Sequence, residues 1–215
     1  MSQEQIIENT RDFVKQKLQN AEGGHDWFHI CRVVNNARII AGKEPVNTFV
    51  VELGALLHDI ADSKFHNGDE SVGPRIARDF LESQELNSET IDHVVNIIKH
   101  ISFKGGNESQ EFLSGELKVI QDADRLDALG AIGIARTFNY GGFKGRPLYD
   151  PDIKPQLQMT KEEYKASTAP TINHFYEKLL LVKERMNTPT GRKMAEERHV
   201  FMEQFLEQFY KEWGE

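Results

Sequence analysis

The sequence predicts an all-α fold of about eight or nine helices. Along most of its 215 residues, apolar side chains recur at intervals of three and four, which is the period of a helix with one buried face. No stretch keeps the two-residue alternation, bounded by hairpin turns, that is typical of strands. The clear loops are the Gly-containing segments 103–107 and 140–147. We therefore expect a bundle of helices joined by loops.

The expected helices follow this period from one turn signal to the next. The second begins after two glycines, where Asp26 can cap its first turn. The third is apolar around most of its circumference, as a buried helix is. A break at Gly130 or Gly133 divides the sixth, and Pro170 is expected to split the seventh. The ranges, in chain order, are 3–19, 26–42, 46–61, 69–83, 88–100, 115–139, 161–187 and 191–213.

The last helix carries an aromatic stripe with a spacing of four residues. Such a stripe either binds a partner or packs on the protein's own core, and the second arrangement is the usual one in amphipathic helices. We therefore expect packing on the core. The stripe consists of Phe201, Phe205, Phe209 and Trp213.

Composition narrows the possible partners and the compartment. The net charge of -8 argues against binding to a nucleic-acid polymer or to a membrane surface, because both require a basic footprint. Cys31 is the only cysteine, so no internal disulfide can form, as is usual in a reducing cytoplasm. No apolar run approaches the roughly 20 residues of a membrane span, and the first residues lack a signal-peptide pattern. We expect a cytoplasmic protein, and composition leaves its oligomeric state open.

The pair His58-Asp59 is the most informative feature of the chain. It lies in the segment 50–61, which is otherwise almost wholly apolar. Burying a carboxylate is unfavourable unless the group meets a charge or a metal. One divalent cation can bind both residues if further ligands approach from neighbouring helices. The sequence therefore predicts a metal site, and the alternative is a pair satisfied by ordinary hydrogen bonds in the core.

The further ligands can be chosen by their positions on helices. His29 begins an apolar stripe, so its imidazole is expected to face the core. Asp124 shares a face with apolar residues of its own helix, whereas Asp122 points nearly the opposite way. Asp127 lies within about 60° of Asp124, which favours a place beside the substrate over direct metal binding. The predicted metal ligands are therefore His29, His58, Asp59 and Asp124.

These residues resemble the signature of the HD-domain metal-dependent phosphohydrolases, which is a histidine, a His-Asp pair and a distant aspartate on separate helices. The resemblance covers roughly residues 20–145 and extends in detail to the small stand-alone YpgQ-like bacterial members. A chain of this length is expected to form one HD-type domain, 1–215, with its metal-site core at about 20–145 and C-terminal helices at 160–213 packed on that core. The detailed match lies in the segments His25-Asp26-Trp27-Phe28-His29, Asp122-Ala123-Asp124-Arg125-Leu126-Asp127 and Arg136-Thr137-Phe138-Asn139-Tyr140-Gly141-Gly142.

Other residues are expected to act on water or on the substrate. Asp62 follows His58 by four residues and so shares its helical face; the family resemblance implies a general acid/base at this spacing, and a solvated aspartate at a helix end is the alternative. Histidines in the region of His93 and His100 bind a second metal or contact phosphate in relatives, and each also fits a core or capping role. Lysine and arginine match phosphate oxygens. The candidate substrate-binding residues are Lys64, His93, His100, Arg125, Asp127, Lys144 and Arg146.

Two imidazoles and two carboxylates suit one divalent ion, with Mn as the expected metal and Mg, Fe, Co, Ni or Zn as alternatives. Such an ion lowers the pKa of its water and neutralises charge on phosphoryl oxygens. We expect hydrolysis of a nucleotide or another small phosphorylated metabolite, and the YpgQ-like resemblance implies a nucleoside or deoxynucleoside triphosphate pyrophosphohydrolase. The alternatives are a phosphomonoesterase or cyclic phosphodiesterase, a nucleotide-binding regulatory protein, and a di-iron oxygenase that uses His93 or His100 on a second ion.

Overall fold

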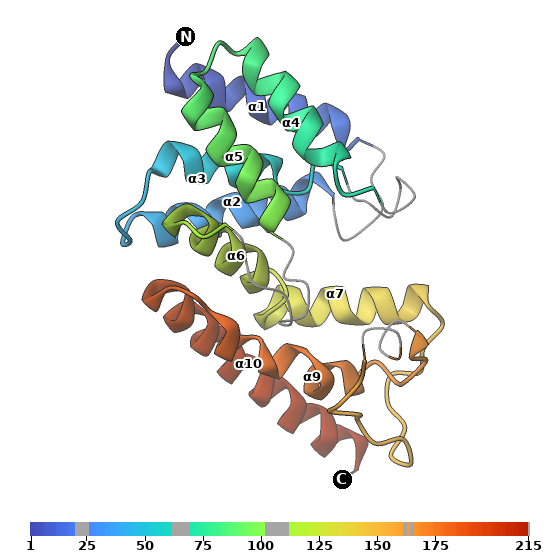
Figure 1. Cartoon of the computed structure of the whole chain (residues 1–215). Coiled ribbons are helices and arrows are strands. Elements are labelled where there is room, and N and C mark those ends of the chain that lie inside the picture. The colour runs from blue at the N-terminus through green and yellow to red at the C-terminus, as the bar shows by residue number, and fades with distance from the viewer. Residues whose placement is uncertain (20–25, 62–68, 102–111, 161–162, 164–165, 215) are drawn as a thin grey trace. The chain divides into compact units, whose positions relative to one another are not determined.

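Every regular element that the computed structural model describes is helical (Figure 1). The described residues are 1–19, 26–61, 69–101, 112–160, 163 and 166–214. Within them the predicted all-α fold is confirmed. None of the described helices combines the length and the apolar character that a bilayer crossing requires. The chain folds into two compact units, Met1–Asp124 and Arg125–Glu215.

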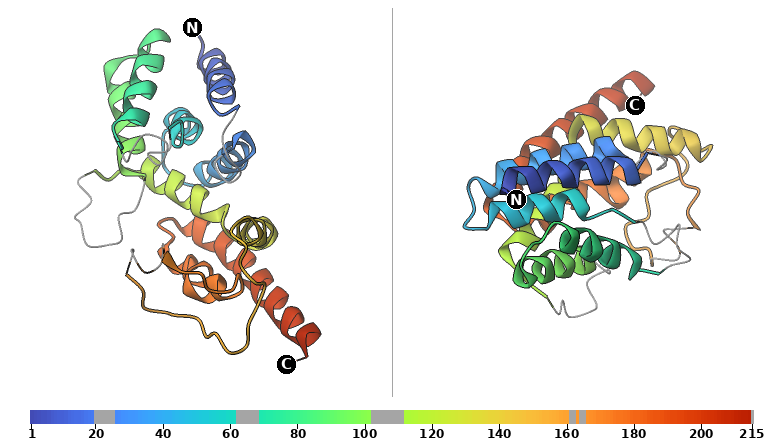
Figure 2. Two further views of the ribbon diagram at one scale, coloured as in Figure 1. Left: turned by 90° about the vertical axis from the view of Figure 1, so that its right-hand side faces the viewer. Right: turned by 90° about the horizontal axis from the view of Figure 1, so that it is seen from above.

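The first unit is built around helix α3. Seven of its ten residues are buried, and it contacts α1, α2 and α5, while α4 packs against α5. Figures 1 and 2 show α4 and α5 side by side. A central apolar helix of this kind holds its neighbours by removing apolar surface from water. The helices are α1 (Gln3–Lys17), α2 (Trp27–Ala41), α3 (Thr48–Leu57), α4 (Val72–Ser83), α5 (Ser88–His100) and α6 (Gly115–Leu126), the last of which ends just beyond the unit.

Side-chain caps set where these helices begin. Asp26 Oδ1 accepts a hydrogen bond of 2.8 Å from the backbone N–H of His29, as the sequence predicted, and Asn87 Oδ1 accepts one of 2.9 Å from Thr90 N–H. Asn47 Oδ1 caps α3 in the same way. Each such cap stabilises a helix by about 1 kcal/mol. The cap at Asp26 therefore fixes the start of α2 and places His29 in its first turn.

The second unit is built around the long helix α10, which contacts α7 and the 3-10 helix η3. The predicted aromatic stripe packs on this unit's own core. Phe205 stacks on Phe175 at 5.8 Å between ring centroids, and Trp213 lies 5.3 Å from Tyr149. Phe201 and Trp213 are each about half exposed, so the two ends of the stripe are only partly covered. The elements are α7 (Gly130–Phe143), α9 (Asn173–Glu177), η2 (Leu179–Leu181), η3 (Lys183–Arg185) and α10 (Pro189–Trp213).

Three expected helix ranges differ from the structure. The helix expected over 46–61 ends at Leu57, so His58 and Asp59 lie in the turn that follows it. The break predicted within 115–139 lies at residues 127–129, and α7 begins at Gly130, whose φ is +71°.

The helix expected over 161–187 is broken at Pro170, as predicted, but the part after Pro170 is not one helix. From residue 167 onward the chain forms α9 and two short 3-10 turns instead, because Pro170 cannot continue a helix and the backbone of Lys178 leaves the helical region at φ -142° and ψ -56°.

Gly141 and Gly142 are neighbours near the end of α7 with different surroundings. A Cβ atom on Gly141 would lie 2.2 Å from Oγ1 of the buried Thr171, whereas one on Gly142 would meet no atom within 4 Å. We expect Gly141→Ala to lower the free energy of unfolding by about 1 to 3 kcal/mol, because Thr171 must shift. Gly142→Ala should raise it by about 0.5 to 1 kcal/mol, because alanine loses less backbone entropy in a helix. Urea or thermal unfolding measures both, and equal destabilisation would contradict the close approach of Thr171 to α7.

Candidate metal centre

Three of the predicted ligands lie together at the C-terminal end of α3 and the first turn of α2. His29, His58 and Asp59 each offer one ligand atom, and these atoms all lie within 4.8 Å of one another. Both histidines are buried. The two rings are 5.4 Å apart between centroids, with an angle of 64° between their planes. Because α3 ends at Leu57, His58 and Asp59 occupy the turn after the helix, where two adjacent residues can face one point.

The hydrogen bond of His58 assigns its tautomer. Nδ1 of His58 lies 2.8 Å from the backbone oxygen of Ala55, one turn earlier in α3. A carbonyl oxygen can only accept a hydrogen bond, so Nδ1 carries the proton and Nε2 presents a lone pair. Metal-binding histidines are held in this way, with the second ring nitrogen donating to a carbonyl or carboxylate. The local structure of α3 thus prepares His58 as a ligand through Nε2.

Asp124, the fourth predicted ligand, lies on α6 beside both histidines, although it is not among the three residues whose ligand atoms all lie within 4.8 Å of one another. Its Oδ1 lies 3.4 Å from His29 Nε2 and 4.0 Å from His58 Nε2. Ligand atoms that bind one ion at about 2.1 Å lie roughly 3 to 4 Å from one another. The side chain of Asp124 is 43% exposed, so the site is open to water on this side. Asp122, predicted to point away from the ion, is fully buried and does not belong to the group that could hold a metal.

The donor set fits a divalent cation. Two imidazole nitrogens and carboxylate oxygens suit Mn, Fe, Co, Ni or Zn, and carboxylates and water suit Mg. Two carboxylates would balance the charge of such an ion, and the imidazoles would bind as neutral ligands. The residues that would hold the ion are therefore His29, His58, Asp59 and Asp124, from α2, α3 and α6. Among the residues that the structure describes, His29, His58 and Asp59 are the one group of three whose ligand atoms all lie close enough together to share an ion.

Two buried amides, which the sequence did not reveal, hold α6 in place. Asn36, two turns after His29 on α2, donates from Nδ2 to the carbonyl of Ala123 at 3.2 Å. Gln121 donates from Nε2 to the carbonyls of His100 and Ile101, at 3.3 and 3.4 Å. These bonds tie α6 to α2 and to the end of α5 within one turn of Asp124. The sequence did contain a signal for Asn36, because a polar residue on the apolar stripe of α2 needs a hydrogen-bond partner once it is buried.

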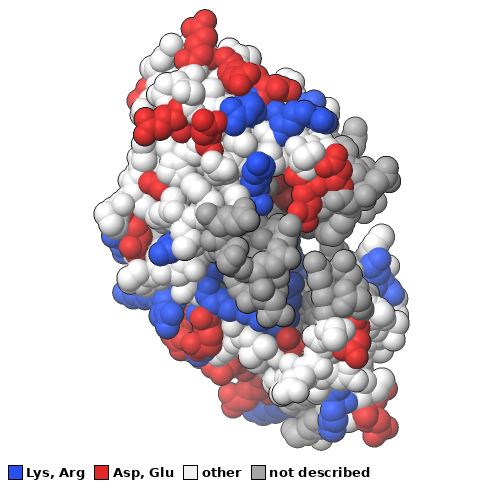
Figure 3. Space-filling view, in the orientation of Figure 1, with Lys and Arg blue, Asp and Glu red and all other residues white. Residues whose placement is uncertain are grey.

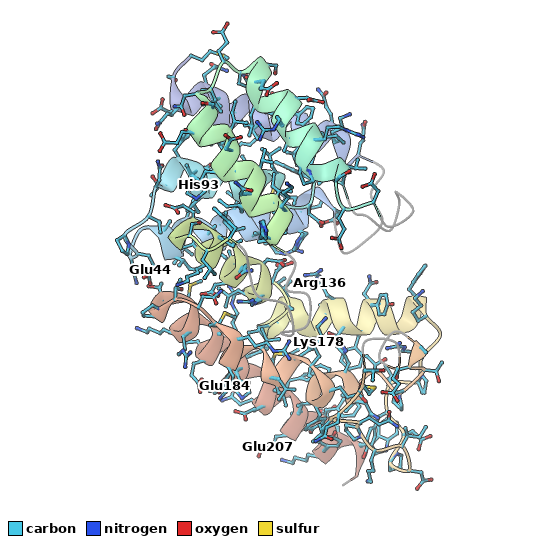
Figure 4. All side chains as sticks on the ribbon, in the orientation of Figure 1. Glu44, His93, Arg136, Lys178, Glu184 and Glu207 are labelled. Atoms are coloured by element: carbon cyan, nitrogen blue, oxygen red, sulfur yellow. The ribbon has the colours of Figure 1, made fainter. Side chains whose placement is uncertain are left out.

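The two extra histidines of α5 have different partners. Nε2 of His93 (Figure 4) is 3.4 Å from Oε2 of Glu116, and Glu116 Oε1 accepts a hydrogen bond from the backbone of Asn47, the N-cap of α3. His93 is therefore near the end of α3 opposite His58. His100, at the C-terminal end of α5, donates from Nδ1 to the carbonyl of Asn96 at 2.8 Å. Neither belongs to the group that could hold a metal.

Four other candidate residues belong to the second unit. Arg125 Nη1 donates to the carbonyl of Arg185 at 2.7 Å. Asp127 is buried, and its Oδ2 accepts a hydrogen bond of 2.6 Å from Arg136 Nη1. Asp127 therefore forms an ion pair inside this unit with Arg136, which Figure 4 labels on α7. Lys144 and Arg146 lie in the loop that follows α7.

Two candidates have no structural description. Asp62 and Lys64 lie outside the described residues, so their proposed roles rest on the sequence.

Figure 3 shows acidic and basic side chains interspersed over the face in view, in keeping with a net charge of -8. Any attraction of an anionic ligand must therefore come from local cations or from a bound metal.

Comparison with known proteins identifies the family. The model of the HD domain matches residues 27–129, which include all four predicted ligands. The chain is 40% identical to YpgQ of Bacillus subtilis over 208 residues, covering 95% of this chain and 92% of that protein. A protein of the Acanthamoeba polyphaga mimivirus, L803, is 28% identical over 186 residues, covering 73% of this chain and 74% of that protein.

Solved structures agree with this assignment. An HD-superfamily hydrolase from Bacillus thuringiensis has a TM-score of 0.81 and 46% identity, with 99% of each chain covered. Bacillus subtilis YpgQ in complex with ADP has a TM-score of 0.78 and 36% identity, with 99% of this chain and 97% of that chain covered. The helical order, the histidines and aspartates gathered at the end of α3, and these relatives lead to one conclusion: the chain belongs to the HD-domain family of metal-dependent phosphohydrolases.

Proposed function

We propose that this protein hydrolyses nucleoside or deoxynucleoside triphosphates to the monophosphate and pyrophosphate, with Mn²⁺ as its metal. The observation that carries the proposal is the gathering of His29, His58 and Asp59 within 4.8 Å, with Asp124 beside both histidines. YpgQ, a relative over nearly the whole chain, has been crystallised with ADP, which supports a nucleotide as ligand. When bound, the ion would supply charge neutralisation for phosphoryl oxygens and a lowered pKa for water.

The residues of the chain contribute position and proton transfer. The bond to Ala55 orients the His58 ring, and the cap at Asp26 sets the position of His29. The exposed side of Asp124 leaves room for a phosphate group to approach. Asp62, four residues after His58 in the sequence, is proposed to accept a proton from the attacking water, a contribution that is typically about 10²- to 10⁴-fold in rate.

The proposed reaction breaks one phosphoanhydride bond. The oxygen of water forms a new bond to the α-phosphorus, and the bond from that phosphorus to the bridging oxygen breaks. Pyrophosphate leaves with the bridging oxygen and its electron pair, and the proton of the water passes to the general base. Pyrophosphate is a better leaving group than the alkoxide that a phosphomonoesterase must expel, so this bond is the easier one to break.

The metal ligands can be tested with a pair of histidine variants. We expect about one divalent ion per chain in the wild-type protein. His58→Ala should lose the ion and the hydrolytic activity, because Nε2 of His58 faces the other ligands. His93→Ala should keep the ion, because His93 contacts Glu116 at the other end of α3. Elemental analysis of the purified variants gives the metal content, and equal loss in the two would show that the site has been placed wrongly.

The position of bond cleavage can be tested with isotopically labelled water. We expect the heavy oxygen to appear in the nucleoside monophosphate, because the attacked α-phosphorus keeps the incoming oxygen, and the other product should be unlabelled pyrophosphate. Mass spectrometry of the products measures both. Label in free orthophosphate, or a free nucleoside released with intact triphosphate, would assign the protein to another phosphohydrolase activity. Nucleotide binding without turnover in the metal-loaded protein would favour a regulatory role.

A further inference from the structure

Two cations in the second unit have no carboxylate partner among the described residues. Lys144 Nζ lies 5.7 Å from the centroid of the Tyr140 ring and 5.4 Å from that of Phe143, and Arg146 Cζ lies 5.7 Å from the same Tyr140 ring. Neither Lys144 nor Arg146 forms an ion pair with a described Asp or Glu. The chain has 34 acidic residues against 26 basic ones, so two neighbouring cations without a carboxylate partner among the described residues are unexpected.

The backbone holds Arg146 in this position. Its N–H donates to the carbonyl of Gly141 at 2.9 Å, in a turn closed by Gly145 at a φ of +64°. Nη2 of Arg146 donates to the carbonyl of Ser167 at 2.6 Å. A guanidinium group has five N–H donors, and the bond to Ser167 uses one of them. The side chain is therefore oriented by the protein, and the hydrogen bond to Ser167 leaves its other N–H groups without an acceptor among the described residues.

The loop after α7 is attached to the chain that leads into α9. The N–H of Thr171 donates to the carbonyl of Pro147 at 2.9 Å, and the N–H of Ile172 donates to the carbonyl of Leu148 at 3.0 Å. These two bonds bring the segment that follows Arg146 next to the residues that precede His174. His174 and Lys178, the second of which Figure 4 labels, are four residues apart and are joined by a backbone hydrogen bond of 3.1 Å. His174 lies in α9, and Lys178 is the residue at which that helix ends.

The electrostatic surroundings of His174 are positive. Burial of the imidazole, together with the neighbouring charges of Lys178 and Arg146, lowers the pKa of His174 to about 4. The two charged groups that lower the pKa of His174, Lys178 and Arg146, are both cationic. The imidazole is therefore neutral at pH 7, and its surroundings would favour an anion.

We propose that the second unit binds the phosphate chain of a phosphorylated ligand in a basic site formed by Lys144, Arg146 and Lys178 around His174. Arginine matches two phosphate oxygens with its planar fork, and lysine adds a point charge. Three positive side chains suit a di- or triphosphate better than a single phosphate, because neighbouring phosphates carry neighbouring charges. The site uses no residue of the metal centre, so it goes beyond the proposed function and can be measured without turnover.

The test uses inorganic pyrophosphate as the probe and the full chain as the protein. The imidazole signal of His174 is followed by NMR across a pH series, with His174→Gln used to assign the signal. In saturating pyrophosphate the pKa of His174 is expected to rise from about 4 by roughly 1 or more, because a bound anion offsets the positive charges nearby. A pKa that does not change overturns the proposed site.

Matched variants separate specific binding from diffuse attraction. Lys144→Gln removes a charge whose amine makes no hydrogen bond to the described chain, so folding should be kept. It is expected to weaken pyrophosphate binding about tenfold, the loss of one charge-assisted hydrogen bond. Lys193→Gln, which removes an exposed lysine of α10, should leave binding unchanged. Equal weakening by the two variants would show diffuse attraction alone and would overturn the proposal.

A third variant separates this site from the metal centre. His58→Ala should retain pyrophosphate binding and the rise in the pKa of His174, because His58 belongs to the first unit. If the protein does not hydrolyse nucleotides but still binds pyrophosphate, the proposed function is wrong and the basic site is supported. If the rise in the pKa of His174 disappears in His58→Ala, pyrophosphate acts through the metal centre and the proposed site is wrong.

Discussion

The backbone carbonyl of Ala55 can only accept a hydrogen bond, so Nδ1 of His58 must donate to it. This bond leaves Nε2 as the ring nitrogen that faces Asp124. This bond arises inside α3 and needs no distant partner. The helix itself is held by burial on several sides, since it contacts α1, α2 and α5. The orientation of a metal ligand therefore depends on the packing of one apolar helix, and a change that shifts α3 would misplace His58 and Asp59 together.

The predicted metal centre also requires α6 to lie at a fixed position along α2. A helix packed by apolar contacts alone can slide at little cost, because dispersion and burial have no direction. Hydrogen bonds from Asn36 and Gln121 remove this freedom, since each requires its carbonyl partner at about 3 Å. A buried amide whose partner moves away would be left unsatisfied, which is unfavourable by about 1 to 3 kcal/mol. These two residues thus contribute to the meeting of Asp124 with His29 although neither is a predicted ligand.

The sequence was most informative where a residue conflicts with its own surroundings. His58 and Asp59 stand out because they interrupt an apolar helix, and helical spacing alone places His29 on a buried face. Spacing could not find the partner of His93, because Glu116 belongs to another helix and only the packed unit brings the two side chains together. The same applies to Asp127, whose ion pair with Arg136 requires the sharp turn at Gly130. The helix expected over 161–187 failed for a related reason: local periodicity does not show where tertiary contacts favour short turns.

The distribution of charge has a consequence for any phosphorylated ligand. The four predicted metal ligands bring two carboxylates and two imidazoles, so without an ion the metal centre would repel phosphate. The second unit differs, because Lys144 and Arg146 have no carboxylate partner among the described residues and the backbone orients one of them. The net charge of -8 does not attract polyanions to the chain. Any electrostatic attraction must therefore come from local positive groups. The proposed metal site and the proposed phosphate site thus consist of separate chemical groups, and we expect that substitution in one leaves binding at the other.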